Sequence, residues 1–147
     1  MSADLQFSCR PISEGIGEGG ALLSKDALCF ALCDAESGCV LEKGHDIDGQ
    51  SVAGKVLVMP TGKGSSVVQA DGLYRLITKN TAPAAVIIET PEPVLVSTII
   101  AMEVPLVDTV DPAFYAAVED GDLLFVDAVA GTVVLRKKAG ASPAAGA

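Results

Sequence analysis

The stretch KVLVMPTGKGSSVVQADGLYRL, residues 55–76, decides the fold. Its first part, KVLVMP, is an apolar run bounded by Gly54 and Pro60, which is typical of a strand buried on both faces. After the loop TGKGSS, apolar residues recur at the spacing of a helix: Ala70, Leu73, Leu76 and Ile77. The stretch therefore predicts a strand, a glycine-rich loop and a helix. Ligand sites in α/β sheets collect at such a loop, because it follows the carboxyl end of a central strand.

The chain continues this alternation towards its C-terminus. APAAVIIET (82–90) predicts a second buried strand, PEPVLVSTIIAMEV (91–104) a helix opened by prolines, and PLVD (105–108) a third strand. DGDLLFVDAVAGTVVLRKK (120–138) predicts a β-hairpin, since two β-branched runs flank a turn. A parallel strand-helix-strand core followed by a hairpin indicates a mixed β and α/β domain.

The first third of the chain is rich in glycine and less regular. SEGIGEGGALLS (13–24) predicts short strands joined by tight turns, ALCFA (27–31) a strand, and the segment from Cys39 a short strand with a polar loop. We expect one domain over residues 1–138. The small-residue tail AGASPAAGA, residues 139–147, is expected to be disordered.

Composition excludes several classes of protein. The formal charge of −9 argues against nucleic-acid binding, because neutralising phosphates requires clustered Lys and Arg. No apolar run approaches the roughly 18 residues of a membrane span, and the first residues lack the pattern of a secretory signal. A soluble, cytoplasmic protein with reduced cysteines is therefore expected.

The four cysteines have no familiar metal-binding spacing. Cys29, Cys33 and Cys39 read C-x3-C-x5-C, which differs from the C-x2-C pairs of zinc and redox sites. Spacing alone leaves iron–sulfur ligation open. The other interpretation is that Cys29 and Cys33 are small buried hydrophobic residues, and we expect no metal site in this chain.

The loop itself does not match the known phosphate motifs. A P-loop needs Gly-Lys followed by Ser or Thr, but Lys63 lies between two glycines, and Val67 occupies the place of the third glycine of a dinucleotide fingerprint. Three interpretations remain. The N–H groups of residues 64–66 could bind an anion, Ser65 or Ser66 could simply cap the helix, or a serine could act as a nucleophile or base.

A complete serine hydrolase in this chain is not expected. The only histidine is His45, and a triad would require it to fold back onto the loop with Asp46, Asp48 or Asp71 behind it. A histidine in a polar turn more often bonds to local backbone. If Ser65 acts as a base, the rest of the site must come from another chain.

Four segments, in order, resemble the small subunits of aconitase X: GIGEGGALLS, GHDIDGQSVAGKVLVMPTGKGSSV, TAPAAVIIETPEPVLVSTIIA and DGDLLFVDAVAGTVVL. The resemblance implies a swivelling β/β/α domain that pairs with a separate large subunit. That large subunit carries the iron–sulfur cluster and most contacts to a small hydroxy-acid substrate. The resemblance also implies that this chain is active only with its partner.

Residue roles follow from the same resemblance. The catalytic base of aconitases is a serine in a Gly-Ser-Ser segment, which corresponds here to Ser65, and Gly62, Lys63, Gly64 and Ser66 would help to bind substrate. Val67 stands where ordinary aconitases carry an arginine. Arg10 and Glu14 are candidates to face the partner.

The family divides by substrate. Some members resemble cis-3-hydroxy-L-proline dehydratase, and others dehydrate mevalonate 5-phosphate. The acidic balance and the single loop lysine provide little positive field for a phosphorylated substrate, which favours the hydroxyproline enzyme. The alternatives are a mevalonate 5-phosphate dehydratase subunit and, in a different class, a non-catalytic or regulatory partner.

Overall fold

The computed structural model describes residues 4–138, so the tail predicted to be disordered, residues 139–147, lies outside the described residues. The elements follow one another in this order: β1 (Leu5–Ser8), β2 (Arg10–Ser13), β3 (Ile16–Leu23), η1 (Phe30–Leu32), β4 (Val56–Met59), α1 (Ser66–Thr78), β5 (Ala85–Ile88), α2 (Pro93–Met102), β6 (Leu106–Asp108), α3 (Pro112–Ala117), β7 (Leu123–Asp127) and β8 (Thr132–Arg136).

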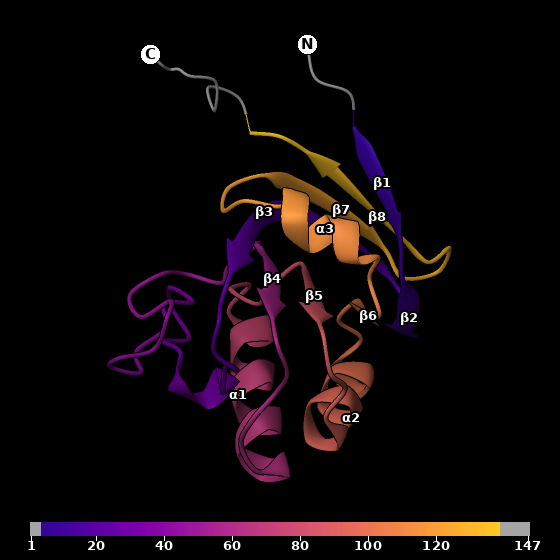
Figure 1. The fold of residues 1–147 in the computed structure, drawn as a ribbon. Coiled ribbons are helices and arrows are strands. Elements are labelled where there is room, and N and C mark those ends of the chain that lie inside the picture. Colours follow the sequence, from indigo (N-terminus) through magenta and orange to yellow (C-terminus); the bar gives the residue numbers. More distant parts are fainter. Residues whose placement is uncertain (1–3, 139–147) are drawn as a thin grey trace, which may run out of the picture.

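All the strands belong to one curled sheet with the order β1-β8-β7-β3-β4-β5-β6-β2. β3, β4, β5 and β6 pair in parallel, and the remaining pairs are antiparallel. Only Cys9 separates β1 from β2, yet these strands pair with opposite edges of the sheet. The short connection draws the two edges together, so the sheet folds back on itself (Figure 1).

The parallel strands are buried on both faces, as predicted for KVLVMP. In β4, Val56 and Val58 point into a core closed by the antiparallel strands and Phe114 of α3. Leu57 and Met59 point the other way, into the core beneath α1 and α2. The layers are therefore antiparallel sheet, parallel sheet and helices, with α1 and α2 side by side on the outer face (Figure 1). The mixed β and α/β fold expected from the sequence is confirmed.

The glycine-rich segment forms one continuous strand, so the prediction of short strands and turns was wrong. Added β-carbons at Gly17 and Gly19 would collide with the backbone of Ala84 and Gly54. These glycines therefore mark places where neighbouring backbone approaches β3 closely, and they do not break the strand.

Two further expectations for the first third of the chain need correction, and three short elements were not predicted. ALCFA (27–31) does not form a strand: Leu28 makes one isolated bridge, and the 3-10 helix η1 begins at Phe30, whose N–H donates to Gln69 of α1 at 2.8 Å. The segment from Cys39 forms no regular strand. It makes two isolated bridges, one between Cys39 and Ser51 and one between Val40 and Cys33. The short elements β1, β2 and α3 were not predicted, because each is four to six residues long and has no clear period.

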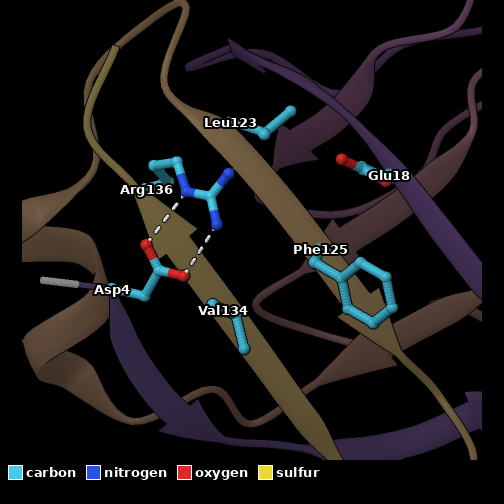
Figure 2. A pocket seen from close by; sticks show the side chains of 6 residues that line it. All are labelled: Asp4, Glu18, Leu123, Phe125, Val134 and Arg136. Atoms are coloured by element: carbon cyan, nitrogen blue, oxygen red, sulfur yellow. Dashed lines mark hydrogen bonds and ion pairs between the residues drawn. The ribbon is translucent and has the colours of Figure 1, made fainter. Parts of the chain in front are cut away.

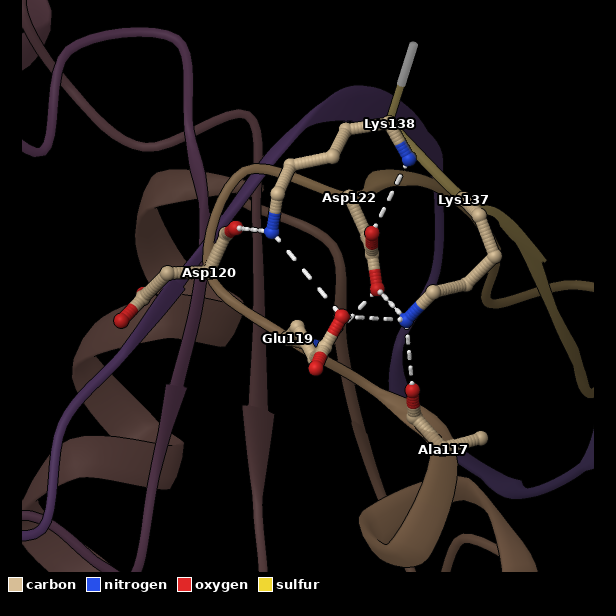
Figure 3. Close-up of polar contacts among 6 residues, drawn as sticks. All are labelled: Ala117, Glu119, Asp120, Asp122, Lys137 and Lys138. Atoms are coloured by element: carbon tan, nitrogen blue, oxygen red, sulfur yellow. Dashed lines mark hydrogen bonds and ion pairs between the residues drawn. The ribbon is translucent and has the colours of Figure 1, made fainter. Parts of the chain in front are cut away.

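An ion-pair network around the buried Asp122 fixes the end of β8 to the turn before β7 (Figure 3). The Lys137 ammonium donates to Asp122 at 2.7 Å and to Glu119 at 3.0 Å. The side chain of Asp122 also accepts the N–H groups of Lys138 and Glu119. Within residues 4–138, no helix has both the length and the apolar character needed to cross a bilayer.

Candidate functional site

The serine loop, residues 60–65, lies between β4 and α1 at the carboxyl end of the parallel strands. The N–H groups of Glu89 and Thr90, which follow β5, donate to the Pro60 carbonyl at 3.0 and 2.9 Å. Gly62 forms a parallel bridge with Leu28, which follows β3. The loop is thus held from both sides by the segments that leave the neighbouring strands.

Ser65 is the N-cap residue of α1. Its backbone is extended, with φ −83° and ψ 163°, and its Oγ accepts the Val68 N–H at 3.4 Å, which is a long hydrogen bond. Ser65 and Ser66 are both exposed. The first turn of α1 contains no acidic residue, so the positive end of the helix dipole is not neutralised there.

Glycine is required at two positions of the loop for different structural reasons. Gly64 has φ +105°, a region that side chains other than glycine rarely adopt, and an added Cβ would lie 3.2 Å from Cys29 Sγ. Gly62 is buried against Leu95 and Glu92 at the start of α2. The Glu92 carboxylate caps α2 by accepting the N–H groups of Val94 and Leu95. The glycines therefore allow the loop to lie between the N-termini of both helices.

Lys63 points to the long insertion between β3 and β4. Its Nζ lies 2.8 Å from Glu42 Oε2, while Glu42 Oε1 is buried without a hydrogen-bond partner. Neither Glu42 nor Glu92 was predicted from the sequence to lie at the loop. Glu92 could have been found as an acid just before the prolines that open a helix, whereas Glu42 has no spacing that links it to Lys63.

His45 is buried within the insertion and does not join the serine loop through its hydrogen bonds. One ring nitrogen, Nε2, lies 2.9 Å from the Ala27 carbonyl, and Nδ1 accepts the Ile47 N–H at 3.2 Å. Arg10 makes a two-pronged ion pair with the buried Asp108, which fastens β2 to β6. The His45 and Arg10 side chains are therefore both engaged within this chain, outside the serine loop.

Cys9 and Cys33 are poorly suited to ligate an iron–sulfur cluster. Cys29 and Cys33 are buried, and burial, with the neighbouring Cys29, Cys39 and Glu42, raises the pKa of Cys33 to about 12. Burial and the charges of Asp108 and Asp127 raise the pKa of Cys9 to about 11. Such thiols stay protonated and are poor ligands. Residues 4–138 contain no group of three His, Cys, Asp or Glu arranged to hold a metal ion.

Two hollows, with volumes of 440 and 300 Å³, lie near the carboxyl ends of the parallel strands and share Glu89 and Tyr115. Burial, followed by the charges of Glu89 and Asp108, raises the pKa of Tyr115 to about 12, and its hydroxyl has no partner. Residues 62–66 line neither hollow.

A third hollow, of 190 Å³, lies on the outer face of the antiparallel strands (Figure 2). Two of its charged groups already bind each other, since the Arg136 guanidinium donates twice to Asp4, at 3.0 and 3.1 Å. The serine loop is therefore the better candidate, and it presents its serines outward to solvent.

Comparison with known proteins identifies the family of this chain. The model of the aconitase X swivel domain matches residues 6–135. A phosphomevalonate dehydratase small subunit from Methanococcoides burtonii is 39% identical over 132 residues, covering 89% of this chain and 96% of the relative. The corresponding protein of Archaeoglobus fulgidus is 41% identical over 135 residues, with coverages of 89% and 98%.

A solved structure has the same fold. The crystal structure of Thermococcus kodakaraensis aconitase X in its holo-form has a TM-score of 0.80 and 36% sequence identity, and the match covers 90% of this chain and 99% of that one. The resemblance noted in the sequence is thereby confirmed, and the chain belongs to the aconitase X swivel-domain family as a subunit of a hydro-lyase.

Proposed function

We propose that this chain is the small subunit of a heteromeric dehydratase that acts on mevalonate 5-phosphate. The relatives described above are phosphomevalonate dehydratase small subunits, and they cover nearly the whole chain. They favour this alternative over cis-3-hydroxy-L-proline, which the sequence analysis preferred. The iron–sulfur cluster and most substrate contacts are assigned to the large subunit.

The preference for hydroxyproline rested on the acidity of the whole chain. That charge is a property of the whole chain and does not describe the loop, and several acids lie far from the loop in ion pairs, for example Asp108 with Arg10 and Asp122 with Lys137. Near the loop the balance differs, because Lys63 offsets Glu42 and the first turn of α1 carries no acid. The Glu92 carboxylate beside Gly62 is engaged by the N–H groups at the start of α2. The local field at the loop therefore does not oppose an anionic substrate.

We further propose that Ser65 is the catalytic base. The observation that carries this role is an exposed serine hydroxyl at the N-terminus of α1, on a loop whose Gly64 adopts φ +105°. Dehydration requires removal of a proton from the carbon next to the carboxylate, while hydroxide leaves from the adjacent carbon. The positive end of the helix and the Val68 N–H would stabilise the Ser65 alkoxide that accepts this proton.

The neighbouring residues would complete the binding surface. The N–H groups of the first turn have no acceptor within the helix, so those of Ser66 and Val67 are suited to bind an anionic group. Gly62 and Gly64 let the substrate approach the backbone closely, and Lys63 adds a positive charge at the edge. Since Ser65 and Ser66 face solvent, the large subunit must supply the rest of the cavity.

The test is reconstitution of the chain with its large subunit and an assay of both substrates. We expect dehydration of mevalonate 5-phosphate at a rate at least about 100-fold above that of cis-3-hydroxy-L-proline. Ser65→Ala should abolish turnover while the subunits still assemble. Turnover of cis-3-hydroxy-L-proline alone would overturn the substrate, and near-normal activity of Ser65→Ala would support a merely structural serine in a non-catalytic partner.

A further inference from the structure

Four large apolar side chains are exposed around the serine loop. The exposed fraction is 75% for Val67 and 42% for Val68 in the first turn of α1, 44% for Leu32 in η1, and 61% for Leu41 in the insertion. None of them is among the buried residues of the two cores. We name these four residues the loop-side patch.

A series of contacts joins the loop-side patch into one surface. Gln69, next to Val68, accepts the Phe30 N–H of η1, and the Leu32 carbonyl at the end of η1 accepts the Leu41 N–H at 2.8 Å. Glu42 then pairs with Lys63, which returns the series to the serine loop. The four apolar side chains and the two serines therefore lie on neighbouring segments, although they are separate in the sequence.

The part of this surface formed by the serine loop and the start of α1 carries little net charge, in a chain whose formal charge is −9. Residues 64–70 contain no ionisable side chain, and the charges of Lys63 and Glu42 offset each other. Contiguous exposed apolar residues without charge are typical of surfaces that another macromolecule covers.

We infer that the loop-side patch docks onto the large subunit, and that the matching face of that subunit is apolar and uncharged. This inference rests on the proposed function, in which the exposed Ser65 must enter a cavity completed by the other chain. The patch adjoins Ser65, so any chain that closes over the serine must also cover Val67. Burial of the patch then both stabilises the complex and excludes water from the base.

The outer face of the antiparallel strands is the competing surface. It also exposes apolar groups, Ile16 at 59% and Phe125 at 39%. That face includes the Asp4–Arg136 pair and Glu18 (Figure 2). It is formed by β7, β8 and the first part of β3, which pairs with β7, whereas only Ala21–Leu23 of β3 pair with β4. A partner bound to that face would not cover the serines, and the face carries more charged side chains than the loop-side patch.

The experiment titrates the small subunit against a fixed amount of the large subunit and measures dehydration of mevalonate 5-phosphate. In Leu41→Asp, and separately in Leu32→Asp, the concentration for half-maximal activity should rise at least about tenfold, with the rate at saturation within about twofold. The matched control is Val129→Asp in the β7–β8 turn, where the side chain is 65% exposed, and its titration should equal that of the wild type. Thermal unfolding checks that each variant folds.

Ser65→Ala separates this inference from the proposed function. Measured by calorimetry, Ser65→Ala should bind the large subunit with wild-type affinity, and yet it should give no turnover. Leu41→Asp should instead bind more weakly and keep its rate at saturation. If neither substrate is turned over, calorimetry on Leu41→Asp and Val129→Asp still tests the docking face directly. Wild-type affinity of both Leu41→Asp and Leu32→Asp would overturn the inference, as would equal weakening by Val129→Asp. A dimer of the isolated chain that Leu41→Asp dissociates, with unchanged binding of the large subunit, would assign the patch to a second copy instead.

Discussion

Lys63 Nζ lies 2.8 Å from Glu42 Oε2, and this ion pair ties the serine loop to the insertion between β3 and β4. One carboxylate oxygen of Glu42 is buried without a partner, so Lys63 is the group that compensates the charge of this carboxylate. The lysine of the loop is therefore held in place before any substrate binds.

The first prediction concerns the strength of this tether. We expect Lys63→Met and Glu42→Gln each to lower the free energy of unfolding by about 0.5–1 kcal/mol, because both side chains remain partly exposed to water. A double-mutant cycle in urea should give a coupling energy of similar size that shrinks in high salt. A coupling energy of zero would show that the pair does not hold the loop.

The second prediction separates the cap from the base at Ser65. Ser65→Asn keeps a capping oxygen and should leave the free energy of unfolding within about 0.5 kcal/mol of the wild type. Ser65→Ala should cost about 0.5–1 kcal/mol, at the lower end for caps, since the bond to Val68 N is 3.4 Å long. Both variants should lose turnover. Retained activity in Ser65→Asn would mean that only the cap matters.

The third prediction concerns the backbone at Gly64. A side chain at φ +105° is strained, so Gly64→Ala should lower the free energy of unfolding by about 1–3 kcal/mol and disturb the position of Ser65. Adding Cys29→Ala removes the thiol that the new methyl group would face, 3.2 Å away. We expect little recovery in this double variant, as measured by thermal unfolding. Full recovery would locate the cost in the thiol contact and not in the backbone.

The fourth prediction concerns the pH dependence of stability at Asp122. Burial raises the pKa of Asp122, but hydrogen bonds from the Lys137 ammonium and from the N–H groups of Lys138 and Glu119 outweigh burial and hold it below the ordinary 3.8. A carboxylate with a lowered pKa in the folded state stabilises the fold above its unfolded pKa. This stabilisation is lost as the pH falls through the folded pKa.

Asp122→Asn should therefore lower the free energy of unfolding by about 2 kcal/mol at pH 7, and the difference from wild type should shrink below about pH 4. Urea denaturation at a series of pH values measures this difference. Asp71→Asn is the matched control, because Asp71 is exposed and pairs with Arg75 at 3.4 Å on the surface of α1. A loss that stays constant down to pH 2 would exclude the ion pair as its source.

The sequence by itself determined the central part of the fold and the place of the candidate site. Three patterns are local: the apolar run in β4, the helical spacing of Leu73 and Leu76, and the hairpin of β7 and β8. Each pattern indicates which residues of its own segment are buried. The same stretch placed the glycines and serines at the carboxyl end of a buried strand. Resemblance to a family supplied the role proposed for Ser65.

Only the tertiary structure decided the features that depend on residues distant in the chain. Gly17 and Gly19 lie within a continuous strand because the backbone of Ala84 and Gly54 packs against them. Phe30 begins a 3-10 turn because Gln69, 39 positions later, takes its N–H. Glu42 reaches Lys63 only when the insertion folds over α1. The spacing of apolar residues within a segment indicates whether that segment forms a helix or a strand. These contacts instead arise from packing between distant segments, so no single stretch of sequence predicts them.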